Sequence, residues 1–189
     1  MLTIYQNPYT KAANRMEVKI DSPDPNTHAG EIICRGDNLM LGYYKNAEAT
    51  AQIIDKDGWL HTGDLATIDE QGYVTIRGRS KNLLLNSSGQ NIYPEEIESK
   101  LNNMPYVAES LIVLQNDKLV ALIYPDFDDA FAQGLQQPDS EKARKANRLE
   151  LNLQLPAFSQ ISKVKIHFEE FEKTAKKSIK RFMYQEAKG

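Results

Sequence analysis

The chain has 189 residues, 41% of them hydrophobic, which is enough to bury a core in one domain or two small ones. Its formal net charge of -3 and its pI near 5.7 give no global reason to expect nucleic-acid binding. No apolar run approaches the roughly 20 residues of a membrane-spanning helix, and the start of the chain lacks a signal-peptide pattern. We therefore expect a cytoplasmic protein with no transmembrane segment and no nucleic-acid partner.

The cysteine and histidine residues indicate whether a disulfide or a metal site is expected. The single cysteine, Cys34, cannot form an internal disulfide, and it lies in an apolar, strand-like run. We expect it to be a buried structural thiol. His28, His61 and His167 are scattered, so no metal-ligand spacing is present.

The chain up to about residue 80 predicts a small β-rich unit. Short strands are expected at 17–20, 31–35, 65–69 and 73–77, with a short helix at 46–54. A hairpin turn at Gln71 and Gly72 would pair the last two strands and bring Arg79 back towards Asp64. These two residues are a candidate nucleotide clamp, although composition alone favours Asp64 after Gly63 as a turn-forming residue.

The pattern changes at residues 78–81, which are interpreted either as a domain boundary or as a strand end with exposed charges. Pro94 is expected at the first position of a helix. Strands are expected at 108–114, 119–124 and 164–168, a charged helix at 140–153 with Ser140 as its cap, and a short basic helix at 178–185. Helices interspersed with strands predict an α+β domain. We thus expect an α+β fold class, with a small β-rich subdomain followed by a compact α+β carboxy-terminal domain.

Two loops carry further candidates. Gly89 in the Ser-Ser-Gly segment 87–89 permits close backbone approach, so exposed amides there could face a phosphate or a pantetheine arm. The alternative is a simple strand-to-helix turn ahead of Pro94. Near the end, Lys176, Lys177 and Lys180 create a local positive field. Their alternative is a solvated basic tail that makes peripheral contact with anionic membrane lipids.

Several of these segments together resemble the adenylate-forming superfamily of acyl-CoA synthetases, luciferases and peptide synthetase adenylation domains. The resemblance rests on Gly30-Glu31-Ile32, Gly36 through Gly42-Tyr43-Tyr44, Thr50, Trp59-x-x-Thr62-Gly63-Asp64, Gly78-Arg79-Ser80-Lys81, Lys173-Thr174 and Ile179-Lys180-Arg181. The Asn-Ser-Ser-Gly-Gln-Asn-Ile-Tyr-Pro-Glu-Glu-Ile-Glu run at 86–98 is most similar to long-chain fatty acid-CoA ligases.

The resemblance implies only the carboxy-terminal portion of a ligase, because the superfamily's Ser/Thr/Gly-rich phosphate loop and Tyr-Gly-x-Thr-Glu stretch do not occur in this chain. Residues 1–80 would be a remnant of the large amino-terminal AMP-binding domain, and 81–189 its mobile carboxy-terminal domain. The implied parent makes an acyl-adenylate from a fatty acid and ATP, then a thioester with CoA. The missing amino-terminal domain is the expected partner, and the chain alone is expected to be inactive. Mg²⁺ is expected with ATP, but without a ligand in this chain.

The resemblance also implies roles for individual residues. Asp64 would accept the two ribose hydroxyls, Arg79 would hold the ribose or phosphate side, and Ile76 would lie against the nucleotide. Lys81 would be the hinge about which the carboxy-terminal domain rotates. Gly89 would belong to the state that binds CoA.

The catalytic lysine is less simply placed. The superfamily usually has Lys-Thr-x-x-Gly-Lys-Ile-x-Arg, and an ungapped alignment puts Ser178 in the position of the catalytic lysine. Lys177, one residue earlier, is the candidate, with Lys176 and Lys180 as alternatives. This irregular segment also favours a second hypothesis, a non-catalytic adaptor or regulatory module with the same fold. A third is a fragment of another acid-activating adenylating enzyme.

Overall fold

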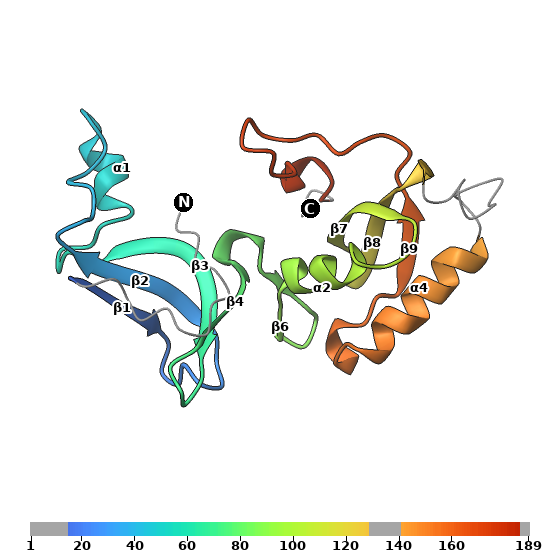
Figure 1. The fold of residues 1–189 in the computed structure, drawn as a ribbon, viewed down its shortest axis with the longest axis horizontal. Coiled ribbons are helices and arrows are strands. Elements are labelled where there is room, and N and C mark those ends of the chain that lie inside the picture. Colours follow the sequence, from blue (N-terminus) through green and yellow to red (C-terminus); the bar gives the residue numbers. More distant parts are fainter. Residues whose placement is uncertain (1–14, 129–140, 186–189) are drawn as a thin grey trace. The chain divides into compact units, whose positions relative to one another are not determined.

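The structure is a computed structural model that describes residues 15–128 and 141–185 (Figure 1). Its contacts cluster into two compact units, residues 1–82 and 83–189, and each is described by itself. The predicted cap Ser140 lies outside the described residues. Both units combine strands with helices, so the predicted α+β class is confirmed.

The first unit is built on a four-stranded antiparallel sheet in the order β1-β2-β3-β4. Its strands are β1 (Met16–Asp21), β2 (Gly30–Gly36), β3 (Leu60–Ile68) and β4 (Val74–Arg79). β3 starts five residues before the predicted strand, so it includes the Thr-Gly-Asp motif. The helix α1 (Ala47–Ala51) is shorter than predicted and begins where the Asn46 side chain accepts a hydrogen bond from the backbone N–H of Ala49 at 2.9 Å.

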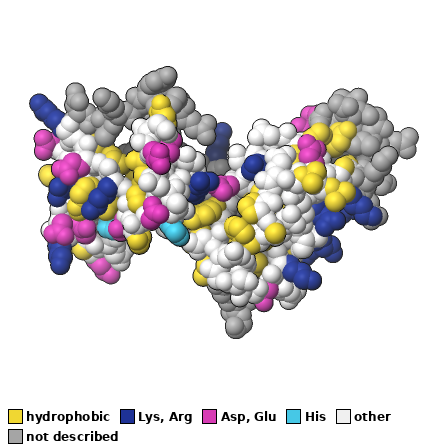
Figure 2. Space-filling model, turned by 90° about the horizontal axis from the view of Figure 1, so that it is seen from below, with side chains coloured by type: hydrophobic (Ala, Val, Ile, Leu, Met, Phe, Trp, Pro, Cys, Tyr) yellow, Lys and Arg dark blue, Asp and Glu magenta, His cyan; other side chains and the backbone are white. Residues whose placement is uncertain are grey.

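The core of this unit lies against one face of the sheet. Ile20, Ile32 and Ala66 are buried there, with Val18, Ile68 and Val74 packed against them. Cys34 is fully buried, as expected, and burial raises the pKa of its thiol. On the face of this unit drawn at the left of Figure 2, acidic and basic side chains are interspersed, with apolar side chains between them.

The second unit is organised around a three-stranded sheet in the order β7-β8-β9. β7 (Val107–Gln115) and β8 (Lys118–Pro125) are antiparallel, and β9 (Lys163–Ile166) pairs parallel to β8. The helix α4 (Glu141–Leu153) lies in the connection from β8 to β9, as a parallel pairing requires. A short hairpin of β5 (Leu84–Leu85) and β6 (Asn91–Ile92) precedes α2 (Pro94–Leu101), which begins at proline as predicted.

The two faces of this sheet have different covers because side chains alternate along a strand. Ile112 points to the face covered by the helices, in a cluster with Ile97 and Leu101 of α2 and Leu151 of α4. Leu111, Val113, Val120 and Phe171 form the opposite cluster, against which Leu122, Tyr124, Ile179 and Tyr184 pack. The carboxy-terminal segment therefore covers the second face.

The predicted basic helix at 178–185 is wrong. Only a 3-10 turn, η3 (Arg181–Met183), forms there, and Lys173 pairs with Ile179 in an antiparallel bridge. Lys177 has a φ of 60°, which a right-handed helix does not allow. Packing of Ile179 and Tyr184 on the sheet overrides the weak helical preference of this stretch.

Two searches of the described residues bear on function. None of the helices is long and apolar enough to cross a membrane. No group of three or more His, Cys, Asp or Glu side chains is arranged to hold a metal ion.

Candidate functional site

The hairpin of β3 and β4 brings Asp64 and Arg79 together, as the sequence predicted. Asp64 is the register partner of Arg79, and Nη1 of Arg79 donates a hydrogen bond to Oδ1 of Asp64 at 2.6 Å. The turn forms where predicted, with Gly72 at a φ of 87°. A carboxylate offers about four acceptor sites, so Asp64 can bind Arg79 and still accept hydroxyls. Ile76 lies on β4 and is 45% exposed, which leaves an apolar surface for a ring to pack on.

The Thr-Gly-Asp motif lies in a bulge of β3. Glu31 on β2 pairs with Leu65 and Ile33 pairs with His61, so the three residues 62–64 stand opposite Ile32 alone. A bulge leaves backbone groups outside the ladder and redirects side chains. Thr62 ties the bulge to β2 because its Oγ1 donates to the carbonyl of Ile32 at 2.7 Å and accepts from the N–H of Asp64 at 3.1 Å.

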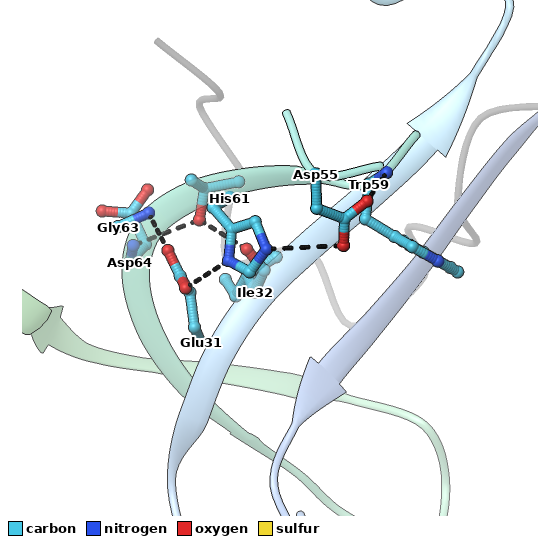
Figure 3. A network of polar contacts seen from close by, with 8 residues as sticks. Glu31, Ile32, Asp55, Trp59, His61, Gly63 and Asp64 are labelled. Atoms are coloured by element: carbon cyan, nitrogen blue, oxygen red, sulfur yellow. Dashed lines mark hydrogen bonds and ion pairs between the residues drawn. The ribbon is translucent and has the colours of Figure 1, made fainter. Parts of the chain in front are cut away.

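Glu31 satisfies another backbone group of this bulge (Figure 3). Its Oε1 accepts a hydrogen bond from the N–H of Gly63 at 2.6 Å, and its Oε2 lies 2.8 Å from Nδ1 of His61. His61 also faces Asp55, with 3.7 Å between Nε2 and Oδ2. The hydrogen bond with Glu31 and the charges of Glu31 and Asp55 raise the pKa of His61, against an opposing effect of burial. Sequence reasoning missed this network.

The predicted hinge and CoA-side residues lie in different surroundings. Lys81 is exposed in the 3-10 turn η1 (Ser80–Asn82), which ends the first unit. Gly89 is at the tip of the β5–β6 hairpin with a φ of 73°. The side chain of Asn86 accepts from the N–H of Ser88 at 3.0 Å and of Gln90 at 2.8 Å. The N–H of Gly89 donates to the carbonyl of Asn86, so these three amides are used within the loop.

The lysine segment forms a tight turn whose ends are Lys173 and Ile179. The N–H of Thr174 donates to the carbonyl of Ser178 and the N–H of Lys177 donates to the carbonyl of Thr174, both at 2.8 Å. Lys177 occupies the left-handed region, where glycine is favoured. In the ungapped alignment this is the glycine of the superfamily pattern, so the backbone supports that register and places Ser178 where the catalytic lysine would stand.

The three candidate lysines differ in their contacts. Lys176 and Lys177 are exposed and form no ion pair with the described residues. Lys180 is ion-paired with Glu172, at 3.4 Å between Nζ and Oε2. Lys173 instead fixes the base of the turn, where its hydrogen bonds to Glu109, at 2.8 Å, and Glu170 raise its pKa to about 12.

A nearly buried ion pair anchors the segment that follows this turn. Arg181, with 13% of its side chain exposed, pairs with Glu98 of α2, whose carboxylate also accepts from the N–H of Ile112 at 2.7 Å. Glu95 adds a second carboxylate 3.9 Å from Arg181. Burial is the larger influence on Glu98 and raises the pKa of its carboxyl in spite of the arginine. We expect no chemical role for Arg181 or Glu98. Their ion pair instead fixes the end of the lysine segment.

The comparison with family models assigns this chain to the carboxy-terminal portion of adenylate-forming enzymes. The chain belongs to the family described as AMP-binding enzyme C-terminal domain, whose model matches residues 81–187. This confirms the superfamily resemblance that the motifs predicted.

The similar proteins include CoA ligases and acyl-CoA synthetases with different names. A 7a-methyl-1,5-dioxo-octahydro-indenyl propanoyl:CoA ligase from Rhodococcus jostii is 47% identical over 103 residues, which is 54% of this chain and 19% of that protein. A putative acyl-CoA synthetase, YngI from Bacillus subtilis, is 44% identical over 108 residues, 54% of this chain and 20% of its own length. The ATP-bound structure of MatB from Rhodopseudomonas palustris superposes with a TM-score of 0.67 at 29% identity, covering 90% of this chain and 33% of that one. The chain thus spans about a fifth of these curated relatives.

Proposed function

We propose that the chain supplies one wall of the nucleotide site and the mobile domain of an AMP-forming acyl-CoA ligase. The observation that carries this proposal is the Asp64–Arg79 pair, which the hairpin register places side by side. Asp64 would accept the two ribose hydroxyls, Arg79 would hold the ribose or phosphate side, and Ile76 would pack against the base. Positioning of this kind makes a bimolecular displacement an oriented one.

The reaction would proceed in two steps. The acid's carboxylate attacks the α-phosphate of ATP, pyrophosphate leaves, and an acyl-adenylate forms. The thiol of CoA then attacks the acyl carbon and AMP leaves. A lysine of the 173–179 turn would stabilise the charge that develops at the α-phosphate. Ser178, at the aligned position, carries no charge, and Lys180 is already paired with Glu172. Lys177, the residue before Ser178, is therefore the proposed cation, with Lys176 as its exposed neighbour.

Rotation of the second unit about Lys81 would exchange the groups presented in the two steps. The location of Lys81 in the last turn of the first unit supports this assignment. Gly89 would face CoA after the rotation. Since the loop's amides at 88–90 bond within the loop, the exposed hydroxyls of Ser87 and Ser88 are the groups left to contact the pantetheine arm.

The proposal also concerns which carboxylic acid the enzyme activates. The similarity of the 86–98 run to long-chain ligases supports a fatty acid, whereas the relatives named above act on several acyl groups, which keeps another carboxylic acid as the second candidate. ATP and CoA are the proposed co-substrates, and the similarity to the ATP-bound structure of MatB supports ATP. We assign Mg²⁺ no ligand among the described residues.

The test uses the full-length parent and the 189-residue chain. In the parent, Asp64→Ala should lower kcat/KM for adenylation by about 100-fold, because the ribose loses its acceptor. Asp57→Ala, which removes an exposed carboxylate from the same unit, is the matched control and should have wild-type activity. The chain alone should bind ATP weakly in isothermal titration and form no acyl-CoA. Robust turnover by the chain, or an active Asp64→Ala parent, would refute the proposal.

A panel of carboxylic acids assayed with the parent then identifies the acyl substrate. Activity with long-chain fatty acids alone supports the finer proposal. A parent that binds partners but activates no acid would favour the adaptor hypothesis instead.

A further inference from the structure

The bulge that carries Asp64 depends on a side chain of the neighbouring strand. Residues 62–64 stand opposite Ile32 alone, so the ordinary ladder cannot satisfy every backbone group there. An unpaired N–H away from water is unfavourable, and Gly63 has a φ of 73°, so its N–H is turned out of the strand pattern. A carboxylate oxygen of Glu31 accepts this N–H at 2.6 Å.

Both oxygens of Glu31 are used in the same network. Oε2 lies 2.8 Å from Nδ1 of His61, and the side chain of Glu31 is 25% exposed. Figure 3 shows Glu31 between the bulge and the imidazole, with Asp55 on the far side of the ring. Asp55 is itself held in a loop, because its Oδ1 accepts from the N–H groups of Asp57 and Trp59 at 2.9 Å. Both carboxylate oxygens of Glu31 are therefore held in place without a bound nucleotide.

We propose that Glu31 is a positioning residue for Asp64, holding the bulge at Gly63 while His61 fixes its second oxygen. The proposal rests on the nucleotide role given to Asp64 above. Glu31 would contact none of the three substrates and would act through the backbone of residues 62–64. A hydrogen bond between a charged carboxylate and a backbone N–H is among the stronger ones in proteins, so its loss should be measurable in the nucleotide site.

Adenylation by the full-length parent tests the role of Glu31. Glu31→Ala should raise KM for ATP by about tenfold or more with a smaller change in kcat, because the bulge relaxes and Asp64 moves. Glu31→Gln should have an intermediate effect, since its single carbonyl oxygen can still accept from Gly63. Glu17→Ala is the matched control, because it removes an exposed carboxylate that pairs with Arg35 on the same sheet. It should have the KM of the wild type.

A second measurement does not depend on activity. In the 189-residue chain, the Gly63 amide proton should resonate downfield and exchange slowly, and Glu31→Gln should shift it upfield while the other β3 amides stay in place. A merely structural role for Glu31 would lower stability without separating KM from kcat. A Glu31→Ala KM within twofold of the Glu17→Ala value, in a parent that Asp64→Ala impairs, would overturn the inference alone. An unimpaired Asp64→Ala enzyme would overturn the proposed function, and the positioning role with it.

Discussion

Replacing Arg181 by alanine should destabilise the second unit far more than the loss of a surface ion pair. Glu98 is 8% exposed, and without Arg181 it would retain the neutral N–H donor of Ile112 and lie near the carboxylate of Glu95. Removing one partner of a buried pair costs about 3–5 kcal/mol. Burial already raises the pKa of Glu98, so proton uptake would limit the loss. We therefore expect about 3 kcal/mol near neutral pH.

The pH dependence of this variant follows from the sign of the shift. A carboxyl whose folded pKa lies above its unfolded value contributes stability below the unfolded pKa and loses it as pH rises through the folded pKa. Without Arg181 the folded pKa of Glu98 rises further. The deficit of Arg181→Ala relative to the wild type should consequently shrink as the pH falls from about 7.5 to about 5.

Urea unfolding of the 189-residue chain measures both effects. Far-ultraviolet circular dichroism follows α2 and α4 of the second unit, whereas the only tryptophan, Trp59, reports on the first. Lys180→Ala is the matched control, because it removes an exposed pair from the adjacent residue and should cost about 0.5 kcal/mol. Arg181→Ala with Glu98→Gln should be more stable than Arg181→Ala alone. The reasoning would be refuted if Arg181→Ala lowered the free energy of unfolding no more than Lys180→Ala. A loss of stability in Arg181→Ala that does not change with pH would also refute it.

Three other predictions concern the hinge, the lysine turn and the network under Asp64. In the parent, Lys81→Pro should slow thioester formation more than adenylate formation in separate half-reaction assays, and equal losses would count against rotation at this residue. Lys177→Gly should stabilise the chain by about 1 kcal/mol in urea unfolding, since glycine accepts the left-handed backbone, while it slows adenylation. Unchanged adenylation would remove Lys177 as the catalytic cation. Because its neighbours Glu31 and Asp55 raise the pKa of His61, the stability that they give is complete below about pH 6.5 and declines as pH rises through the folded pKa. Trp59 fluorescence in urea should show the advantage of wild type over His61→Gln shrinking across that range, and a constant difference would contradict this.

The sequence predicted the parts of the site that local patterns control. Alternating strands around a glycine turn were sufficient to pair Asp64 with Arg79, because hairpin register follows from the turn. The role of Glu31 could not be read in the same way, since it depends on a bulge between β2 and β3 that strand periodicity does not reveal. A charged residue at the start of β2, directly before the apolar run 32–34, was the available signal. Likewise, the helix expected at 178–185 failed because packing of Tyr184 on the sheet is a tertiary contact.

In each unit a carboxylate on a strand or helix fixes an irregular segment that carries a charge with a proposed function. In the first unit Glu31 of β2 holds the bulge of Asp64, and in the second Glu98 of α2 holds Arg181 beside the lysine turn. The Glu31 contact lies within the first unit and the Glu98 contact lies within the second. A rotation about Lys81 would therefore change which groups face the substrate without breaking either anchor. If the proposed rotation and two-step reaction are correct, preorganisation of these groups would be retained through both half-reactions.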